Sequence, residues 1–144
     1  MKYFLIFLCV FFQFSSISQN TDSIFKDLDV FDLQYVSNPQ ISPDGSVIIY
    51  RRMSFDILKD RSIGNLWIVN SDGTNHQKLT SIESVEYGAV WSPSGDRLAF
   101  ISSTDQGPEI FIYWNNSAKY ARISQLDGSP SNLTWSQNGK KLAF

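Results

Sequence analysis

A ten-residue phrase recurs three times along the chain and limits its fold more than any other feature. The copies span residues 41–50, 91–100 and 135–144, and each has a Ser-x-x-Gly core followed by an apolar run. Their serines lie at positions 42, 92 and 136, so successive copies are 50 and 44 residues apart. Periods of this size are typical of repeat proteins. The sequence therefore predicts a fold built from repeated units.

The second half of the repeat supports the same register. The stretch 65–70 aligns with 109–114, and Trp67 precedes Ser92 by 25 residues just as Phe111 precedes Ser136. Within each phrase an Asx-Gly or Ser-Gly pair separates two apolar stretches, which is a signal for a tight hairpin turn. These pairs are Asp44-Gly45, Ser94-Gly95 and Asn138-Gly139, and Asp72-Gly73 repeats the device later in the first unit. Each complete unit is predicted to contain four short strands.

The strands are continuous apolar runs, at residues 47–50, 66–69, 98–101 and 110–113. Such runs indicate strands that are covered on both faces, so that sheets stack on sheets. Four-stranded sheets at this period are typical of a β-propeller, which closes with about four to eight blades. We predict an all-β fold, an incomplete β-propeller of four-stranded antiparallel blades.

About two and a half blades are expected within residues 39–144. The first blade is predicted at 39–80, the second at 87–124, and the start of a third at 131–144. Because the third breaks off inside a strand, we expect the gene to continue with further repeats. Residues 19–38 are predicted to be a lead-in, in which Asp29 caps a short helix over 30–34 with Phe31 and Tyr35 on its buried face.

Residues 1–18 have the pattern of a signal peptide. Lys2 supplies the positive charge, residues 3–14 are almost entirely apolar, and Ser16 and Ser18 are small residues at the positions that a signal peptidase reads. Cleavage is expected before Gln19, giving a chain exported to the periplasm or the medium, with no membrane association afterwards. An uncleaved anchor is the weaker alternative, since twelve apolar residues are shorter than the roughly 20 that span a bilayer.

Charge and cysteine content exclude some partners and bonds. Removal of the signal peptide leaves 11 basic and 14 acidic residues, and it also removes Cys9, the single cysteine. The pairs Arg51-Arg52 and Lys140-Lys141 are interpreted as solvated turn or edge residues, so nucleic acid is not an expected partner. The aromatic residues at matching repeat positions, Tyr50, Phe100 and Phe144, are predicted to pack in the core or between blades.

One hairpin of the first blade is longer than its counterpart. From Tyr50 to Trp67 there are 17 positions, whereas Phe100 to Phe111 spans 11, and the extra residues fall around 55–61. Added length in one blade can mark a loop used for contact. A tolerated surface insertion is the preferred explanation.

Nothing in the chain resembles a reaction centre. There is no Gly-x-Ser-x-Gly motif, and metal-site spacings of histidine or cysteine are absent. The single histidine, His76, lies in a polar stretch that predicts a surface position. Asp44, Asp72 and Asp105 accompany predicted turns. No catalytic, cofactor-binding or metal-binding residue is therefore predicted, and no cofactor.

Several segments nevertheless resemble a known family. They are Asp29–Leu33, Val36–Gly45, Asp60-Arg61 with Asn65–Val69, and Lys78–Thr80. Together they resemble the start of a secreted serine peptidase of the prolyl oligopeptidase family, of the acylaminoacyl-peptidase or dipeptidyl-peptidase type. The later repeats resemble TolB-like propellers in general, although Gln137-Asn138 stands where such repeats usually have proline and aspartate.

The resemblance implies a propeller that precedes an α/β-hydrolase domain and restricts its active site to short peptides. The family's catalytic residues lie in that later domain, so this chain alone is expected to be inactive, with peptide substrates reaching it through the missing domain. The alternative is a non-enzymatic periplasmic propeller, similar to TolB, that binds protein partners.

Overall fold

The computed structural model describes residues 26–82 and 84–144, and the predicted signal peptide lies outside these ranges. Within these ranges ten strands follow one short helix: η1 (Asp27–Asp32), β1 (Tyr35–Ile41), β2 (Val47–Asp56), β3 (Arg61–Asn70), β4 (Gln77–Lys78), β5 (Glu86–Trp91), β6 (Arg97–Thr104), β7 (Gly107–Trp114), β8 (Lys119–Arg122), β9 (Thr134–Trp135) and β10 (Leu142–Ala143). No helix in the described part of the chain has the length and hydropathy needed to cross a membrane.

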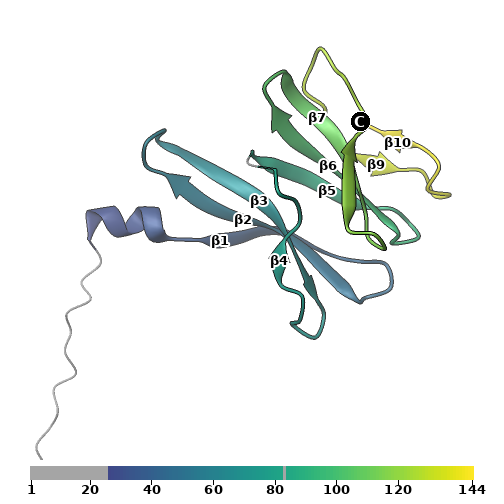
Figure 1. Ribbon diagram of the computed structural model, residues 1–144, viewed down its shortest axis with the longest axis horizontal. Helices are drawn as coiled ribbons and strands as arrows, with labels where there is room; N and C mark the ends of the chain where they lie inside the picture. Colours follow the sequence, from purple (N-terminus) through teal and green to yellow (C-terminus); the bar gives the residue numbers. More distant parts are fainter. Residues whose placement is uncertain (1–25, 83) are drawn as a thin grey trace, which may run out of the picture.

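The strands form two four-stranded antiparallel sheets and one two-stranded hairpin. Their orders are β1-β2-β3-β4, β5-β6-β7-β8 and β9-β10, so neighbours in sequence are neighbours in each sheet. Figure 1 shows the two sheets side by side, with the yellow β9–β10 hairpin beyond the second sheet. This is the predicted blade architecture, with two complete blades and the first hairpin of a third.

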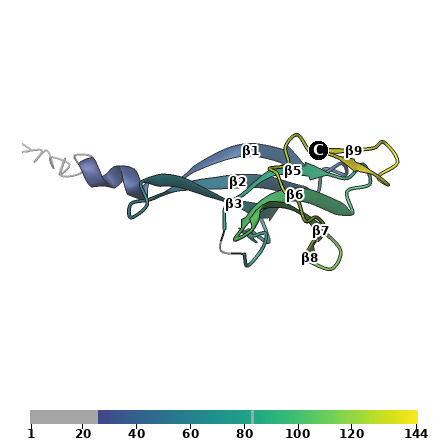
Figure 2. The ribbon, with the colours of Figure 1, turned by 90° about the horizontal axis from the view of Figure 1, so that it is seen from above.

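Two apolar interfaces hold the three units together, and we call them the first and second seams. The first seam packs Ile49 and Leu66 of the first sheet against Leu98 and Phe100 of the second, all at most 2% exposed. The second seam packs the other face of the second sheet, including Ile101, on side chains of the third unit. Seen from above in Figure 2, the units follow one another along the molecule.

The prediction of strands covered on both faces is correct for the second sheet and wrong for the first. Residues 98–101 are at most 1% exposed because the second sheet lies between two units. In β2 and β3 the runs at 47–50 and 66–69 alternate instead between buried and half-buried residues. The first sheet contacts another unit on one face only among the described residues, and its other face is partly exposed.

The lead-in helix lies earlier than predicted. The structure has a 3₁₀ helix at Asp27–Asp32 with no buried residue, and the Asp29 carboxylate accepts a hydrogen bond from the Lys26 N–H (2.8 Å). Tyr35 is the first residue of β1, where it pairs with Met53 and packs its ring against Phe55. Tyr35, which the sequence places on the buried face of the helix, therefore belongs instead to the strand that pairs with β2.

The longer hairpin of the first blade extends as regular β-structure. Strands β2 and β3 have ten residues each, whereas β6 and β7 have eight, and the connecting loop is two residues longer. At its tip Leu58 is 92% exposed. The insertion thus lengthens this hairpin and exposes Leu58 at its tip.

Candidate functional site

The three recurrent turns have the same backbone network. In each, the serine N–H donates to the carbonyl of the residue five positions later (2.8–2.9 Å), and the serine hydroxyl accepts that residue's N–H (2.9–3.1 Å). The glycine N–H donates to the serine carbonyl. These glycines, at 45, 95 and 139, have φ of 76°, 70° and 64°, which is a conformation that favours glycine. The Ser-x-x-Gly phrase is therefore a structural turn, as its sequence predicts.

The acceptor for the serine hydroxyl differs among the turns. Ser42 donates to Asp44 (2.5 Å) and Ser136 to Asn138 (2.9 Å), two positions on, whereas Ser92 donates to Asp96 (2.8 Å), four positions on. The hydrogen bond from Ser42 is the main cause that lowers the pKa of Asp44 to about 2. For Asp96 the hydrogen bonds from Ser94 and then from Ser92 lower the pKa to about 2. Both carboxylates stabilise turns, which accounts for them without a substrate.

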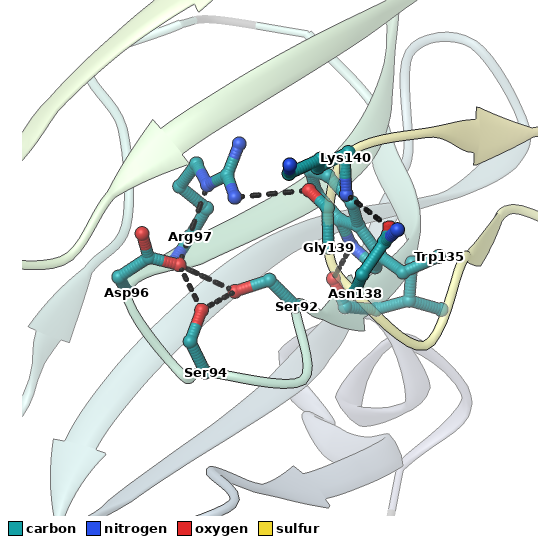
Figure 3. A network of polar contacts seen from close by, with 9 residues as sticks. Ser92, Ser94, Asp96, Arg97, Trp135, Asn138, Gly139 and Lys140 are labelled. Atoms are coloured by element: carbon teal, nitrogen blue, oxygen red, sulfur yellow. Dashed lines mark hydrogen bonds and ion pairs between the residues drawn. The ribbon is translucent and has the colours of Figure 1, made fainter.

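Successive turns also contact each other across the seams, as Figure 3 shows for the second and third. The Arg97 guanidinium donates to the Gly139 carbonyl (3.0 Å), lies 5.0 Å from the centroid of the Trp135 ring, and forms an exposed ion pair with Asp96 (3.3 Å). An added Cβ at Gly95 would lie 3.3 Å from Pro43 of the preceding turn. The row of turns is thus part of the packing between blades.

A buried carboxylate connects the second sheet to β3 of the first sheet and to the segment that follows β4. Glu86, fully buried at the start of β5, accepts hydrogen bonds from the Leu66 N–H (2.9 Å) and the Thr80 hydroxyl. These donors belong to the first sheet and its outer end, whereas Glu86 belongs to the second. Burial raises the pKa of Glu86, against the opposing effect of its hydrogen bonds. Glu86 is therefore a polar tie across the first seam.

The second sheet places a carboxylate at the equivalent junction from a different strand. Glu109 of β7 is 1% exposed and accepts hydrogen bonds from the Ser124 hydroxyl and the Leu126 N–H (3.1 Å). The hydrogen bond from Ser124 lowers the pKa of Glu109. The sequence offered no signal for either glutamate, because they occupy different repeat positions.

The candidate chemical groups singled out from the sequence do not come together. His76 is exposed, and its Nε2 shares a hydrogen bond with the Tyr50 hydroxyl beside the Trp67 ring. Asp72 stabilises a turn with Thr74, whose hydrogen bonds lower the pKa of Asp72. Asp105 is exposed at the β6–β7 turn. Across residues 26–82 and 84–144 there is no cluster of three acidic, histidine or cysteine side chains that could hold a metal.

The aromatic residues at matching repeat positions have three different environments. Phe100 is fully buried and stacks on Phe111, with ring centroids 5.6 Å apart, which confirms the predicted core role. Tyr50 is half-buried on the open face of the first sheet. Phe144 is 61% exposed, and no described segment covers it, so its predicted packing between blades stays a prediction.

The interpretation of the Arg51-Arg52 pair as solvated turn or edge residues is wrong. Both lie in β2, which is an inner strand of its sheet, and their side chains alternate between its faces. The Arg52 guanidinium lies 4.6 Å from the Trp67 ring centroid, and that of Arg51 lies 5.9 Å from the ring centroid of Tyr87 in the next blade. Lys140 and Lys141 are exposed, as predicted.

Arg51 also lines a pocket of about 400 Å³ between the first strands of the three units, which we call the first-strand pocket. Asn38, Gly88 and Asn132 occupy equivalent repeat positions on its wall and have φ of 49°, 64° and 53°. In β1 and β5 these residues form bulges in the pairing with the next strand. The sequence could have indicated these positive-φ residues, because an asparagine or glycine lies four residues before each repeat serine and both residue types tolerate positive φ.

No family model matches the chain. It is 27% identical over 112 residues to dipeptidyl-peptidase 5 from Porphyromonas gingivalis, covering 78% of the chain and 16% of the relative. It is 32% identical over 78 residues to the Tol-Pal system protein TolB from Vesicomyosocius okutanii subsp. Calyptogena okutanii, covering 54% of the chain and 18% of the relative. The chain thus spans less than a fifth of these relatives.

Solved structures share the fold at low sequence identity. Acylaminoacyl peptidase from Pyrococcus horikoshii superposes with a TM-score of 0.64 at 16% identity, over 78% of this chain and 17% of that one. The β-propeller domain of the trilobed protease from Pyrococcus furiosus gives 0.59 at 20% identity, over 76% and 32%. The chain is an incomplete β-propeller that matches the propeller part of prolyl oligopeptidase-family peptidases.

Proposed function

We propose that this chain is the amino-terminal propeller part of an exported serine peptidase, in which it gates the entry of short peptides and positions them for a hydrolase domain. The observation that carries the proposal is the match of 78% of the chain to dipeptidyl-peptidase 5. The signal-peptide pattern at residues 1–18 supports export.

The structure is compatible with a scaffold rather than a catalyst. The row of turns and the two buried glutamates are used in packing and hydrogen bonding within and between blades. Rigid strands and seams of this kind can hold exposed loops and pocket walls in fixed positions around an opening. Nucleophile, base and oxyanion donors would then come from the hydrolase domain.

The proposal is tested by the reading frame beyond codon 144 in the source genome. We expect further repeats followed by a Gly-x-Ser-x-Gly motif, which places a nucleophilic serine at a strand-to-helix turn. The purified 19–144 segment should not cleave a chromogenic dipeptide or acyl-amino-acid substrate. Turnover by this segment, or a stop codon after the last repeat, would contradict the proposal.

A second candidate function follows from the 32% identity to TolB. In that case the propeller would be non-enzymatic and would bind a protein partner. The same reading frame separates the two candidates, because a propeller that ends without a hydrolase domain favours the binding protein. Export is common to both, and it predicts that the secreted form begins at Gln19 when its amino terminus is sequenced.

A further inference from the structure

Arg51 places a positive charge where the repeat otherwise has an apolar residue. Fifty residues later, the equivalent Ile101 is 1% exposed in the second seam. In β2, Arg51 pairs with Leu66 of β3 and Ser37 of β1, and its guanidinium reaches the Tyr87 ring of the next blade. A charge at a seam position loses hydration without the packing that an aliphatic side chain would provide.

Among the described residues no carboxylate forms an ion pair with Arg51. Within residues 26–82 and 84–144 the one ion pair is that of Arg97 with Asp96, and the buried Nε of Arg51 has no hydrogen-bond acceptor. Burial lowers the pKa of Arg51, as expected for a cation that has lost water and gained no carboxylate. Arg51 is half-buried and its Nε lacks an acceptor among the described residues, so its guanidinium is open to a partner from elsewhere.

The surroundings of Arg51 fit its guanidinium closely. A Cβ at Gly64 would lie 2.4 Å from the Arg51 Nε, so this glycine leaves the space in which the side chain lies. Of the described residues that line the first-strand pocket, Arg51 is the single charged one, and none is a carboxylate. Asn38 and Asn132 add side-chain amides to the same wall. The pocket therefore offers one positive charge and neutral donors.

We propose that the first-strand pocket binds the carboxylate group of a short peptide, with Arg51 as its principal ligand. A guanidinium donates two parallel hydrogen bonds to a carboxylate, and one cation balances one negative charge. A phosphate dianion would leave a second negative charge uncompensated in a partly buried site. The choice of a peptide as the carrier of this carboxylate rests on the proposed function.

The full 144-residue chain can be titrated by calorimetry with acetyl-Gly-Gly, with its carboxyl amide, and with inorganic phosphate. We expect saturable binding of the acid and at least tenfold weaker binding of the amide and of phosphate. Equal binding of acid and amide, preferential binding of phosphate, or no saturable binding of the acid would overturn the inference.

Two neighbouring arginines provide a matched pair of variants. Arg51→Ile introduces the residue type found at the equivalent position of the second blade, and we expect it to weaken binding of acetyl-Gly-Gly at least tenfold. Arg52→Ile removes the same charge on the opposite face of β2, and it should change binding less than twofold. Equal losses in the two variants would show a general charge effect and would overturn the assignment.

Gly64→Ala provides a second variant that keeps the charge. Its Cβ would displace the guanidinium, so binding should weaken several-fold while thermal unfolding and far-UV circular dichroism report whether the fold is retained. Unchanged binding by a folded Gly64→Ala or Arg51→Ile variant would contradict the site. These measurements use the chain without a hydrolase domain, so a negative binding result would not contradict the proposed peptidase function. Conversely, a reading frame without the serine motif would contradict the peptidase function, and the titration would still decide whether the carboxylate site exists.

Discussion

The two complete blades each place a carboxylate at the same polar junction, but from different strands. At both junctions the donors are an N–H of the third strand and a hydroxyl that follows the fourth strand: Leu66 and Thr80 in the first blade, Ile110 and Ser124 in the second. The first blade uses Glu86 of the following blade. The second uses its own Glu109, and there Ser124 Oγ itself accepts the Ile110 N–H.

Each blade has a carboxylate at one of two repeat positions and a different residue type at the other. Asn65 stands in the first blade where Glu109 stands in the second, and Pro130 stands before the third unit where Glu86 stands before the second. A carboxylate at either position can reach the shared hydroxyl. The comparison teaches that the repeat preserves a polar function at this junction while the residue that performs it moves between strands. It also makes the first seam depend on a carboxyl group from the following blade, whereas the second blade uses its own.

The largest expected effect is a difference in the free energy of unfolding between a substitution in the second sheet, which is covered on both faces, and one in the first sheet, which is covered on one. Phe100→Ala should lower the free energy of unfolding by about 3–5 kcal/mol, because it removes a fully buried ring stacked on Phe111. Tyr50→Ala, at the equivalent position of the first sheet, should cost about 1 kcal/mol because Tyr50 is half-buried. Urea denaturation of both variants measures the difference, and equal losses would contradict the asymmetry.

Removal of Glu86 is expected to have the next largest effect. Glu86→Ala leaves the Leu66 N–H and the Thr80 hydroxyl buried without their acceptor, which should lower the free energy of unfolding by about 2–3 kcal/mol. Glu109→Ala also removes the acceptor of two donors, the Ser124 hydroxyl and the Leu126 N–H, but these are only partly buried, so it should cost about 1–2 kcal/mol.

The reciprocal layout suggests a rescue experiment. Adding Asn65→Glu to Glu86→Ala gives the first junction the arrangement of the second, so about half of the lost free energy of unfolding should return. Asn65→Glu in the unmodified chain is the control, and it should destabilise because it brings a second carboxylate beside Glu86. A double variant whose loss is the sum of the two single losses would show that the junctions are not equivalent.

The pH dependence of stability should differ in sign between the two glutamates. The pKa of Glu86 is raised above its ordinary value of 4.5 by burial, so its contribution is present below about pH 4.5 and is lost as pH rises through the folded-state pKa. The pKa of Glu109 is lowered by the Ser124 hydrogen bond, so its contribution is present above about pH 4.5 and is lost as pH falls.

Glutamine variants test these opposite signs. The free energy of unfolding should be measured with denaturant from pH 3 to pH 7. In Glu86→Gln it should fall less toward neutral pH than in the unmodified chain, and in Glu109→Gln it should fall less toward acid pH. The glutamine side chain keeps the size of each residue and does not titrate, so the slope is the informative quantity. Parallel slopes in the two variants would contradict the assignment of the shifts.

The sequence predicted the features that repeat and missed those that do not. The turns at Asp44, Ser94 and Asn138 and the four-strand order follow from local signals, since a glycine at positive φ and short apolar runs need no tertiary information. Glu86 and Glu109 could not be found because each is defined by a partner in another strand. Arg51 was misread because its burial depends on Gly64 and on the next blade, which no local pattern contains.

The smallest expected effect concerns the acid dependence of stability, which should differ between the first two turns, with aspartate, and the third, with asparagine. The pKa values of Asp44 and Asp96 are about 2, below the ordinary 3.8, so their stabilisation is present above about pH 4 and is lost as pH falls toward 2. Asn138 accepts the equivalent hydrogen bonds without titrating. Asn138→Asp should therefore add a small acid-dependent loss of stability, and Asp44→Asn should remove one.

The exposure of these turns keeps both changes small, because solvent screens the charges. The measurement is the thermal unfolding midpoint at pH 2.5 and pH 6, with Asp105→Asn, at an exposed turn aspartate outside the three recurrent turns, as the control. Asp44→Asn should narrow the difference between the two midpoints, Asn138→Asp should widen it, and Asp105→Asn should leave it close to that of the unmodified chain. If Asn138→Asp and Asp44→Asn shifted the difference in the same direction, the hydroxyl acceptor would not be the group that makes these turns sensitive to acid.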